Sequence, residues 1–156
     1  MALLFLDTSA LAKYYRREPG SDFVERLFAD AGAQRVISRL AMVEMESALA
    51  TKVRTGEIDS ETALIARRRL ESDLGRRNVL MAAIGDDHFE VARRLLVRYG
   101  ADRSLRTLDA LQLSAAVGLR RAGYPPIFVA SDQRLCEVAE LEGFQVTNPE
   151  HPTLTV

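Results

Sequence analysis

Near its start the chain reads Leu3-Leu4-Phe5-Leu6-Asp7-Thr8-Ser9, which is four apolar residues followed by a carboxylate and two hydroxyls. A short run that is entirely apolar predicts a strand buried on both faces, as in a parallel sheet. Thr8 or Ser9 is then expected to cap the helix that follows. Asp7 therefore falls at the carboxyl end of a buried strand, where open α/β sheets build their sites. The alternative is a turn or capping role for Asp7, since aspartates are common at strand ends.

Length and composition indicate one globular domain. The chain has 156 residues, of which 47% are hydrophobic and 28% charged, and its formal net charge is -1. This composition argues against general disorder. The near-neutral charge gives no sign of a nucleic-acid partner, although it does not exclude one. We expect a single domain over residues 1–150 and a short tail over 151–156.

The single cysteine, Cys136, is expected in a helix and partly buried. It allows neither an intramolecular disulfide nor a cysteine-rich zinc site. The N-terminal sequence lacks a basic segment, and its apolar run is too short for a signal peptide. No stretch is long and apolar enough to span a membrane. We therefore expect a cytoplasmic protein.

Strands alternate with helices along the rest of the chain. Further strands are expected over residues 35–37, 79–84, 127–130 and 144–146. Helices are expected over residues 10–17, from 21, over 38–55, from 59 or 60 to about 75, from 87 to 100, from 107 to 123 and from 131 to 143. Ser21, Ser38 and Ser131 are the expected N-caps, and Asp87 with Glu90 has the spacing of a capping box. The alternation predicts an α/β fold with a mainly parallel sheet covered by helices on both faces.

Glu44 is expected inside a helix, on the face that packs inward. Its neighbours at helical spacing are all uncharged, namely Leu40, Ser47, Ala48 and Thr51. Glu46 lies about 200° round the same helix and has the pattern of a solvated side chain. An acid on an inward face needs a reason, and the alternative to a functional role is a buried ion pair with an arginine.

Two further acids lie at the starts of helices. Asp109 falls in the first turn of the sixth expected helix, where the helix dipole favours an acid. Asp132 follows the strand at 127–130 as Asp7 follows the first strand, and it too has the alternative of a plain first-turn acid. The carboxyl ends of parallel strands share one edge, so Asp7 and Asp132 are expected to face one crevice, which the two helical acids would line.

Four like charges in one crevice repel, and without a cation at least one carboxyl group should have a raised pKa. A hard divalent cation resolves this, and magnesium or manganese fits a set of oxygen ligands. Zinc is disfavoured because the histidines, His88 and His151, stand apart from these motifs. Such a metal can activate a water and neutralise the charge that builds on a phosphate during displacement. The lack of an evident histidine pair for acid–base work disfavours a metal-free ribonuclease mechanism.

Four motifs, taken in chain order, resemble the PIN-domain nucleases. They are Leu6-Asp7-Thr8-Ser9, the run from Ser38 to Glu44, Leu105-Arg106-Thr107-Leu108-Asp109-Ala110-Leu111-Gln112-Leu113-Ser114-Ala115-Ala116 and Val129-Ala130-Ser131-Asp132-Gln133-Arg134-Leu135. The closing run Gly143-Phe144-Gln145-Val146-Thr147-Asn148-Pro149 is similar to the usual end of that family. Within the family the chain looks most like the VapC toxins of prokaryotic type II toxin–antitoxin systems, from about Leu3 to Pro149.

The resemblance implies a three-layer α/β/α fold with a central parallel sheet and a magnesium- or manganese-dependent endoribonuclease. Position by position, it implies that the catalytic, metal-binding acids are Asp7, Glu44, Asp109 and Asp132. It implies that the hydroxyls of Thr8, Ser9 and Ser131 orient acids, water or substrate. It also implies an RNA substrate, a homodimer, and a VapB-type antitoxin whose tail lies across the acidic site and often inserts an arginine.

Several arginines are candidates for contact with RNA phosphates, namely Arg16, Arg17, Arg67, Arg68, Arg69, Arg103 and Arg106. A solvated helix face is the alternative for most of them. Arg103 and Arg106 are the strongest candidates because they lie just before Asp109. The fourth expected helix carries Leu64, Leu70 and Leu74 among its arginines, and it is instead a candidate surface for a partner or the antitoxin.

Two other functions compete with the nuclease. A haloacid-dehalogenase-like phosphatase also begins with an aspartate after a buried strand. That family normally has a second aspartate two residues on as general acid, and here the position is Ser9. A PIN-like module used only for binding is the non-catalytic alternative, but it predicts missing acids, and all four are present.

Overall fold

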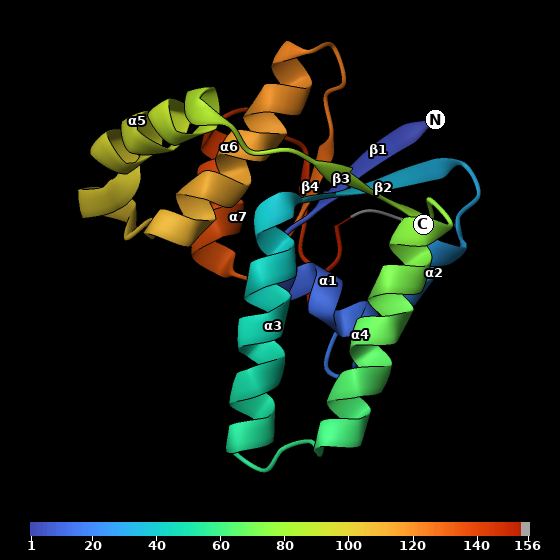
Figure 1. Ribbon diagram of the computed structural model, residues 1–156. Helices are drawn as coiled ribbons and strands as arrows, with labels where there is room; N and C mark the ends of the chain where they lie inside the picture. The colour runs from blue at the N-terminus through green and yellow to red at the C-terminus, as the bar shows by residue number, and fades with distance from the viewer. Residues whose placement is uncertain (154–156) are drawn as a thin grey trace.

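Residues 1–153, the part of the chain that the computed structural model describes, form a five-stranded parallel sheet flanked by seven helices (Figure 1). The strands are β1 (Ala2–Leu6), β2 (Ala33–Ser38), β3 (Val79–Ala82), β4 (Ile127–Val129) and β5 (Val146–Thr147). The helices are α1 (Thr8–Tyr15), α2 (Ser21–Ala29), α3 (Arg39–Arg54), α4 (Ser60–Gly75), α5 (Asp86–Arg103), α6 (Thr107–Arg121) and α7 (Gln133–Leu141). The predicted α/β fold with a parallel sheet is confirmed.

The strand order β3-β2-β1-β4-β5 places the first strand of the chain in the centre of the sheet. From β1 the chain moves outward to β2 and β3, and it then returns to the other side of β1 for β4 and β5. Leu6 at the end of β1 lies opposite Val129 at the end of β4. The direction of winding therefore reverses between β1 and β4. Ligand sites of open α/β sheets lie outside the carboxyl ends of the strands at such a switch point.

Each face of the sheet packs against its own group of helices (Figure 1). Leu4 and Leu6 are buried in the core formed with α1, α2, α3 and α4. Phe5 is buried in the other core, formed with α5, α6 and α7, and it stacks on Phe128 with ring centroids 5.5 Å apart. Alternate residues of β1 thus enter opposite cores, which is why the first strand is apolar without interruption.

The helix caps beside the predicted site differ from the sequence-based expectation. Asp7, and not Thr8 or Ser9, is the N-cap of α1, and its carboxylate accepts a hydrogen bond from the backbone amide two residues on. Asp132, and not Ser131, is the N-cap of α7, and its Oδ1 accepts two backbone amides of the first turn. An aspartate caps a helix as well as a hydroxyl residue does, so the hydroxyls are left for other partners.

The start of α5 also differs from the prediction. Its N-cap is Gly85, whose amide donates to His88 Nδ1, so the expected capping box of Asp87 and Glu90 is wrong. The helix passes through Gly100 instead of ending there. The neighbouring turns are buried against α6, and this packing outweighs the cost of about 1 kcal/mol for a glycine inside a helix.

Smaller shifts occur at α2 and β5. Gly20, with φ of 88°, is the N-cap of α2, and Ser21 is its first helical residue instead of its cap. A Cβ at Gly20 would lie 2.9 Å from the Pro149 carbonyl carbon, so close approach of the C-terminal segment also requires glycine there. β5 begins two residues later than expected, because Phe144 enters the core against Phe128.

The remaining expectations concern the tail, the cysteine and membrane spans. The expected tail at residues 151–156 runs past the described part of the chain, since residues 154–156 lie outside it. Cys136 is buried in α7, where burial raises the pKa of its thiol to about 12. Across residues 1–153, no helix combines the length and the apolar character needed to cross a membrane.

Candidate active site

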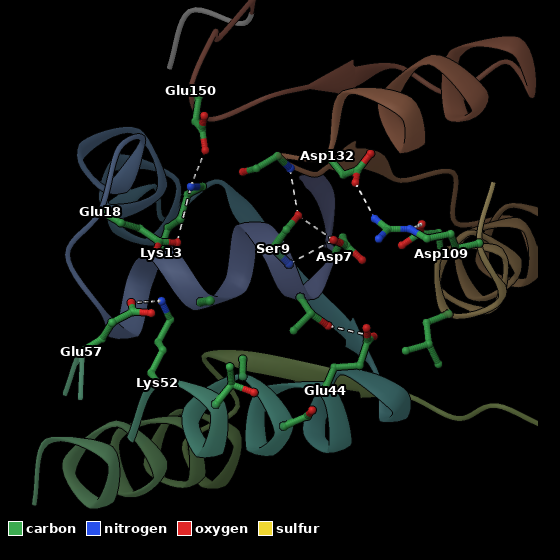
Figure 2. A pocket seen from close by; sticks show the side chains of 18 residues that line it. Asp7, Ser9, Lys13, Glu18, Glu44, Lys52, Glu57, Asp109, Asp132 and Glu150 are labelled. Atoms are coloured by element: carbon green, nitrogen blue, oxygen red, sulfur yellow. Dashed lines mark hydrogen bonds and ion pairs between the residues drawn. The ribbon is translucent and has the colours of Figure 1, made fainter. Parts of the chain in front are cut away.

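A cleft of about 740 Å³ lies at the carboxyl ends of β1 and β4, where the winding of the sheet reverses (Figure 2). Its lining comes from α1, α3, the start of α6, the β4–α7 loop and the C-terminal segment. One end holds the carboxylates of Asp7, Glu44, Asp109 and Asp132. The other end holds those of Glu18, Glu57 and Glu150, together with two lysines. We refer to these two regions as the acidic end and the lysine end.

Asp7 lies in the wall of the acidic end and is 5% exposed. Its Oδ2 accepts hydrogen bonds from the Ser9 amide at 3.0 Å and from Ser9 Oγ at 2.6 Å. Ser9 Oγ in turn accepts the Ser131 amide at 2.9 Å, which links the ends of β1 and β4. The pKa of Asp7 is raised to about 6, chiefly by burial and to a smaller extent by nearby Glu44 and Asp109, while the Ser9 hydrogen bonds act in the opposite direction. Asp7 is therefore a buried acid, and no cationic side chain of residues 1–153 forms an ion pair with it.

Glu44 enters the cleft from α3 and is half-buried. Its Oε1 accepts hydrogen bonds from Thr8 Oγ1 at 3.1 Å and from Gln112 Nε2. Among the ion pairs formed by residues 1–153, none includes Glu44, so the alternative of a buried ion pair with an arginine is not realised. Glu46 is solvated, as expected, and pairs with Arg67 at 2.7 Å.

Arg106 bridges the other two acids of the acidic end. Its Nε donates to Asp109 Oδ2 at 3.3 Å, and its Nη2 donates to Asp132 Oδ2 at 2.9 Å. Burial raises the pKa of Asp109, Arg106 lowers it and Asp132 raises it, with burial the largest effect. Arg106 itself is 68% exposed, so its guanidinium is a solvent-accessible counter-ion.

The lysine end is neutralised by close ion pairs. Lys13 is only 4% exposed, and its Nζ lies 2.8 Å from Glu150 Oε1 and 3.5 Å from Glu18 Oε1. The same Nζ donates to the Pro19 carbonyl at 2.8 Å. Lys52 Nζ lies 3.2 Å from Glu57 Oε2. Each of the three carboxylates at this end therefore has a cation within ion-pair distance.

The donor set at the acidic end suits a hard divalent cation, because carboxylate and hydroxyl oxygens are what magnesium and manganese prefer. Asp7 Oδ1 and Glu44 Oε2 accept no hydrogen bond from residues 1–153, so each acid has one oxygen available. In the same range, no three His, Cys, Asp or Glu side chains are grouped tightly enough to form an assembled metal site. Arg106 holds two of the acids, and the side chains would have to turn toward each other to share one cation.

Eight of the nine predicted site residues line this one cleft, and they are Asp7, Thr8, Ser9, Glu44, Arg106, Asp109, Ser131 and Asp132. Arg103, at the end of α5, does not line it. The Ser131 hydroxyl is buried and has no hydrogen-bond partner within residues 1–153. The hydroxyls of Thr8 and Ser9 donate to Glu44 and Asp7, respectively.

Sequence reasoning missed Gln112 and Lys13. Gln112 is fully buried on α6, where its side chain contacts Thr8, Ser38 and Glu44. A signal was available, because Gln112 follows Asp109 by one helical turn and interrupts an apolar run. Lys13 is likewise a charged residue within a short apolar helix. Neither pattern identifies the partner, which is distant in the chain.

The PIN domain family matches this sequence over residues 4–141, a range that includes all four acids of the acidic end. Among solved structures, the fold is similar to a chain of a toxin–antitoxin complex from Klebsiella pneumoniae, with a TM-score of 0.59 and 17% sequence identity. The similarity covers 95% of this chain and 98% of that chain, and at this identity it shows the fold alone. No curated protein matches the sequence. By its sequence over most of its length, and in agreement with its fold, the chain belongs to the PIN-domain family.

Proposed function

We propose that this protein is a magnesium- or manganese-dependent endoribonuclease and the toxin of a VapBC-type toxin–antitoxin system. The observation that carries the proposal is the contrast in charge within the cleft. Asp7 and Glu44 have no cationic partner among residues 1–153, and they lie at the switch point of the sheet beside two further acids. Uncompensated carboxylates are costly, and a site for a hard cation gives a physical reason to keep them.

The cation would be held by Asp7, Glu44 and Asp109. Asp132 would bind it through Oδ2, because its Oδ1 already caps α7. When bound, the cation supplies a Lewis acid that promotes ionisation of water and offsets charge on the phosphate. Ser9 fixes the carboxylate of Asp7 through two hydrogen bonds to one oxygen. This leaves the second oxygen of Asp7 in a defined position for a ligand.

Arg106 is the proposed contact to the RNA backbone within the cleft. Its guanidinium is exposed and held by carboxylates that a cation would also attract. A planar guanidinium recognises phosphate oxygens through paired hydrogen bonds. Thr8 and Ser9 would act on the substrate indirectly, by orienting the carboxylates of Glu44 and Asp7 to which their hydroxyls donate. The Ser131 hydroxyl is buried and would have to turn toward the cleft to contact substrate. Arg103 would contact RNA outside the cleft.

The toxin assignment and the partner are also proposals. The chain has nearly the same extent as a protein in the Klebsiella toxin–antitoxin complex. We infer a VapB-type antitoxin that covers the acidic end, and a homodimer. Growth arrest on expression of the wild-type chain, absent with Asp7→Asn, would support the toxin role, whereas equal growth would contradict it.

Cleavage of mixed cellular RNA tests the enzymatic function directly. The wild-type protein should cut RNA with millimolar magnesium or manganese and lose this activity with a chelator, and mapping of the cut ends would define the preferred sequence. Asp7→Asn serves as the inactive variant, which excludes a contaminating nuclease. Metal-dependent turnover of a small phosphomonoester without RNA cleavage would favour the phosphatase alternative. Binding of RNA without cleavage would favour the non-catalytic module.

A further inference from the structure

We propose that Gln112 is a positioning residue, which fixes the Glu44 carboxylate with one oxygen bonded to the protein and the other left for the cation. Gln112 is fully buried in α6, behind the wall of the acidic end. It does not line the cleft, so it is not expected to touch substrate or metal. The inference rests on the proposed metal-dependent function.

The Gln112 amide uses all of its hydrogens and its oxygen. Nε2 donates to Thr8 Oγ1 at 2.9 Å and to Glu44 Oε1. Oε1 accepts the hydroxyl of Ser38 at 2.7 Å. The side chain therefore joins α1, the end of β2 and α3 to α6, and no buried polar atom of the amide is left without a partner.

The hydrogen bonds also fix which way the amide faces. Ser38 is the N-cap of α3, and its Oγ accepts the Ala41 amide at 3.2 Å. Its hydroxyl hydrogen is therefore free to donate, and the acceptor beside it is Gln112 Oε1. A flipped amide would place that oxygen against the Glu44 carboxylate, where two acceptors would face each other. Ser38 thus directs the donating side of Gln112 toward Glu44.

Both donors that reach Glu44 act on the same oxygen. Thr8 Oγ1 and Gln112 Nε2 bind Oε1, while Oε2 accepts nothing from residues 1–153. A glutamate side chain has considerable rotamer freedom, and fixing it before the cation binds removes part of the entropy cost of ligation. Partners behind a metal ligand that hold it in place in this way commonly change metal affinity by about 10- to 100-fold when they are removed.

A purely structural role for Gln112 makes a different prediction. In that case its loss would lower the melting temperature without a specific effect on metal binding. Ser114 provides a matched comparison, because it is a fully buried polar residue on the same helix. Its Oγ donates to the Leu111 carbonyl at 2.7 Å, and among residues 1–153 its side chain makes no hydrogen bond to a site residue. Ser114→Ala therefore disturbs α6 without altering Glu44.

The test measures binding of Mn²⁺ alone, without RNA, by titration calorimetry on the full chain. Gln112→Met keeps the length of the side chain and removes its hydrogen bonds, and we expect its Mn²⁺ affinity to fall about tenfold or more. Ser114→Ala should keep the wild-type affinity even where its melting temperature falls by a similar amount. In RNA cleavage, Gln112→Met should lower kcat at saturating RNA and leave KM unchanged. A crystal structure of metal-free Gln112→Met should show Glu44 in a different rotamer.

Ser38→Ala is the second variant, for use if Gln112→Met does not fold. It keeps Gln112 but removes the hydroxyl that orients it, and we expect Mn²⁺ affinity to fall about threefold to tenfold. This inference would be overturned if the folded Gln112 variant, or Ser38→Ala in its place, bound Mn²⁺ within twofold of the wild-type affinity. The proposed function would then remain intact. A wild-type protein that binds no Mn²⁺ and cuts no RNA would overturn both.

Discussion

The two ends of the cleft contain the same kind of side chain but differ in how the carboxylates are paired with cations (Figure 2). At the lysine end, Glu18, Glu57 and Glu150 each lie within 3.5 Å of a lysine nitrogen. At the acidic end, the donors that Asp7 and Glu44 find among residues 1–153 are hydroxyl, side-chain amide and backbone groups, without a cation. Carboxylate content alone therefore does not identify a functional site. A buried carboxylate without a counter-ion, such as Asp7, is the stronger indication, because its uncompensated charge lowers stability.

The largest expected effect is loss of RNA cleavage, which we expect from a substitution at the acidic end and not from one at the lysine end. Asp7→Asn should lower kcat for RNA cleavage by about 10³-fold or more, because the lost ligand weakens the electrostatic stabilisation of the phosphate. Glu150→Gln, at the lysine end of the same cleft, is the control, and it should retain activity after correction for the fraction folded. Cleavage is measured on a defined RNA with saturating magnesium. Equal losses in both variants would contradict the functional distinction between the two ends.

The second prediction concerns the pH dependence of stability. The pKa of Asp7 is raised from 3.8 to about 6, so between these values the folded state binds a proton that the unfolded state has released. The free energy of unfolding should therefore decrease from pH 4 to pH 6 by about 3 kcal/mol through this group, and then level off. Asp7→Asn should lack this decrease and be more stable than wild type at pH 7, as measured by urea unfolding without metal.

Asp59 is the matched comparison with Asp7 for the pH dependence of the free energy of unfolding. It also caps a helix, but it is exposed, and the hydrogen bond from the Thr62 amide lowers its pKa. Its contribution to stability should increase as the pH rises through the acid range, which is the opposite sign. A wild-type pH profile identical to that of Asp7→Asn would show that burial does not raise the pKa of Asp7.

The third prediction addresses the lysine end. Lys13→Met removes a buried cation and leaves two acids facing each other, and it should lower the free energy of unfolding by about 2 kcal/mol. This value lies below the usual cost of breaking a buried pair because Glu18 and Glu150 are 26% and 39% exposed. The double variant Lys13→Met with Glu150→Gln should recover part of the loss in urea unfolding. No recovery would mean that the packing of the lysine stem, and not its charge, stabilises this end.

The sequence was sufficient to predict the parallel sheet and the position of the acids at its carboxyl edge. It did not predict which side chains contact those acids. The apolar run before Asp7 is sufficient to predict a central parallel strand, and the carboxyl edge of the sheet then brings Asp7 and Asp132 together. What sequence periodicity cannot give is a side-chain partner far along the chain. The contact of Gln112 with Glu44 spans 68 positions, and that of Lys13 with Glu150 spans 137. These contacts depend on tertiary packing, which local pattern does not specify.

The N-cap of α1, predicted as a hydroxyl residue and found to be an aspartate, also depends on tertiary packing. Thr8, Ser9 and Asp7 are all competent caps, and local preference does not rank them. The tertiary structure decides, because Thr8 finds Glu44 and Ser9 finds the Ser131 amide. Asp7 is then the residue left to cap α1, and it accepts the Ser9 amide in the first turn.

The smallest expected effect concerns Arg106, the cation that pairs with Asp109 and Asp132 at the acidic end. Arg106→Gln should raise KM for RNA by about threefold to fivefold at low salt and leave kcat unchanged, since exposed ion pairs are weak. It should not weaken binding of Mn²⁺ alone, because the guanidinium competes with the metal for Asp109 and Asp132. Arg93→Gln is the matched control: Arg93 is 67% exposed and uses the same two kinds of nitrogen on Glu90, away from the cleft. If Arg106→Gln instead lost Mn²⁺ affinity, the arginine would be stabilising the acids in their metal-binding arrangement, and the acidic end would not be a site short of cations.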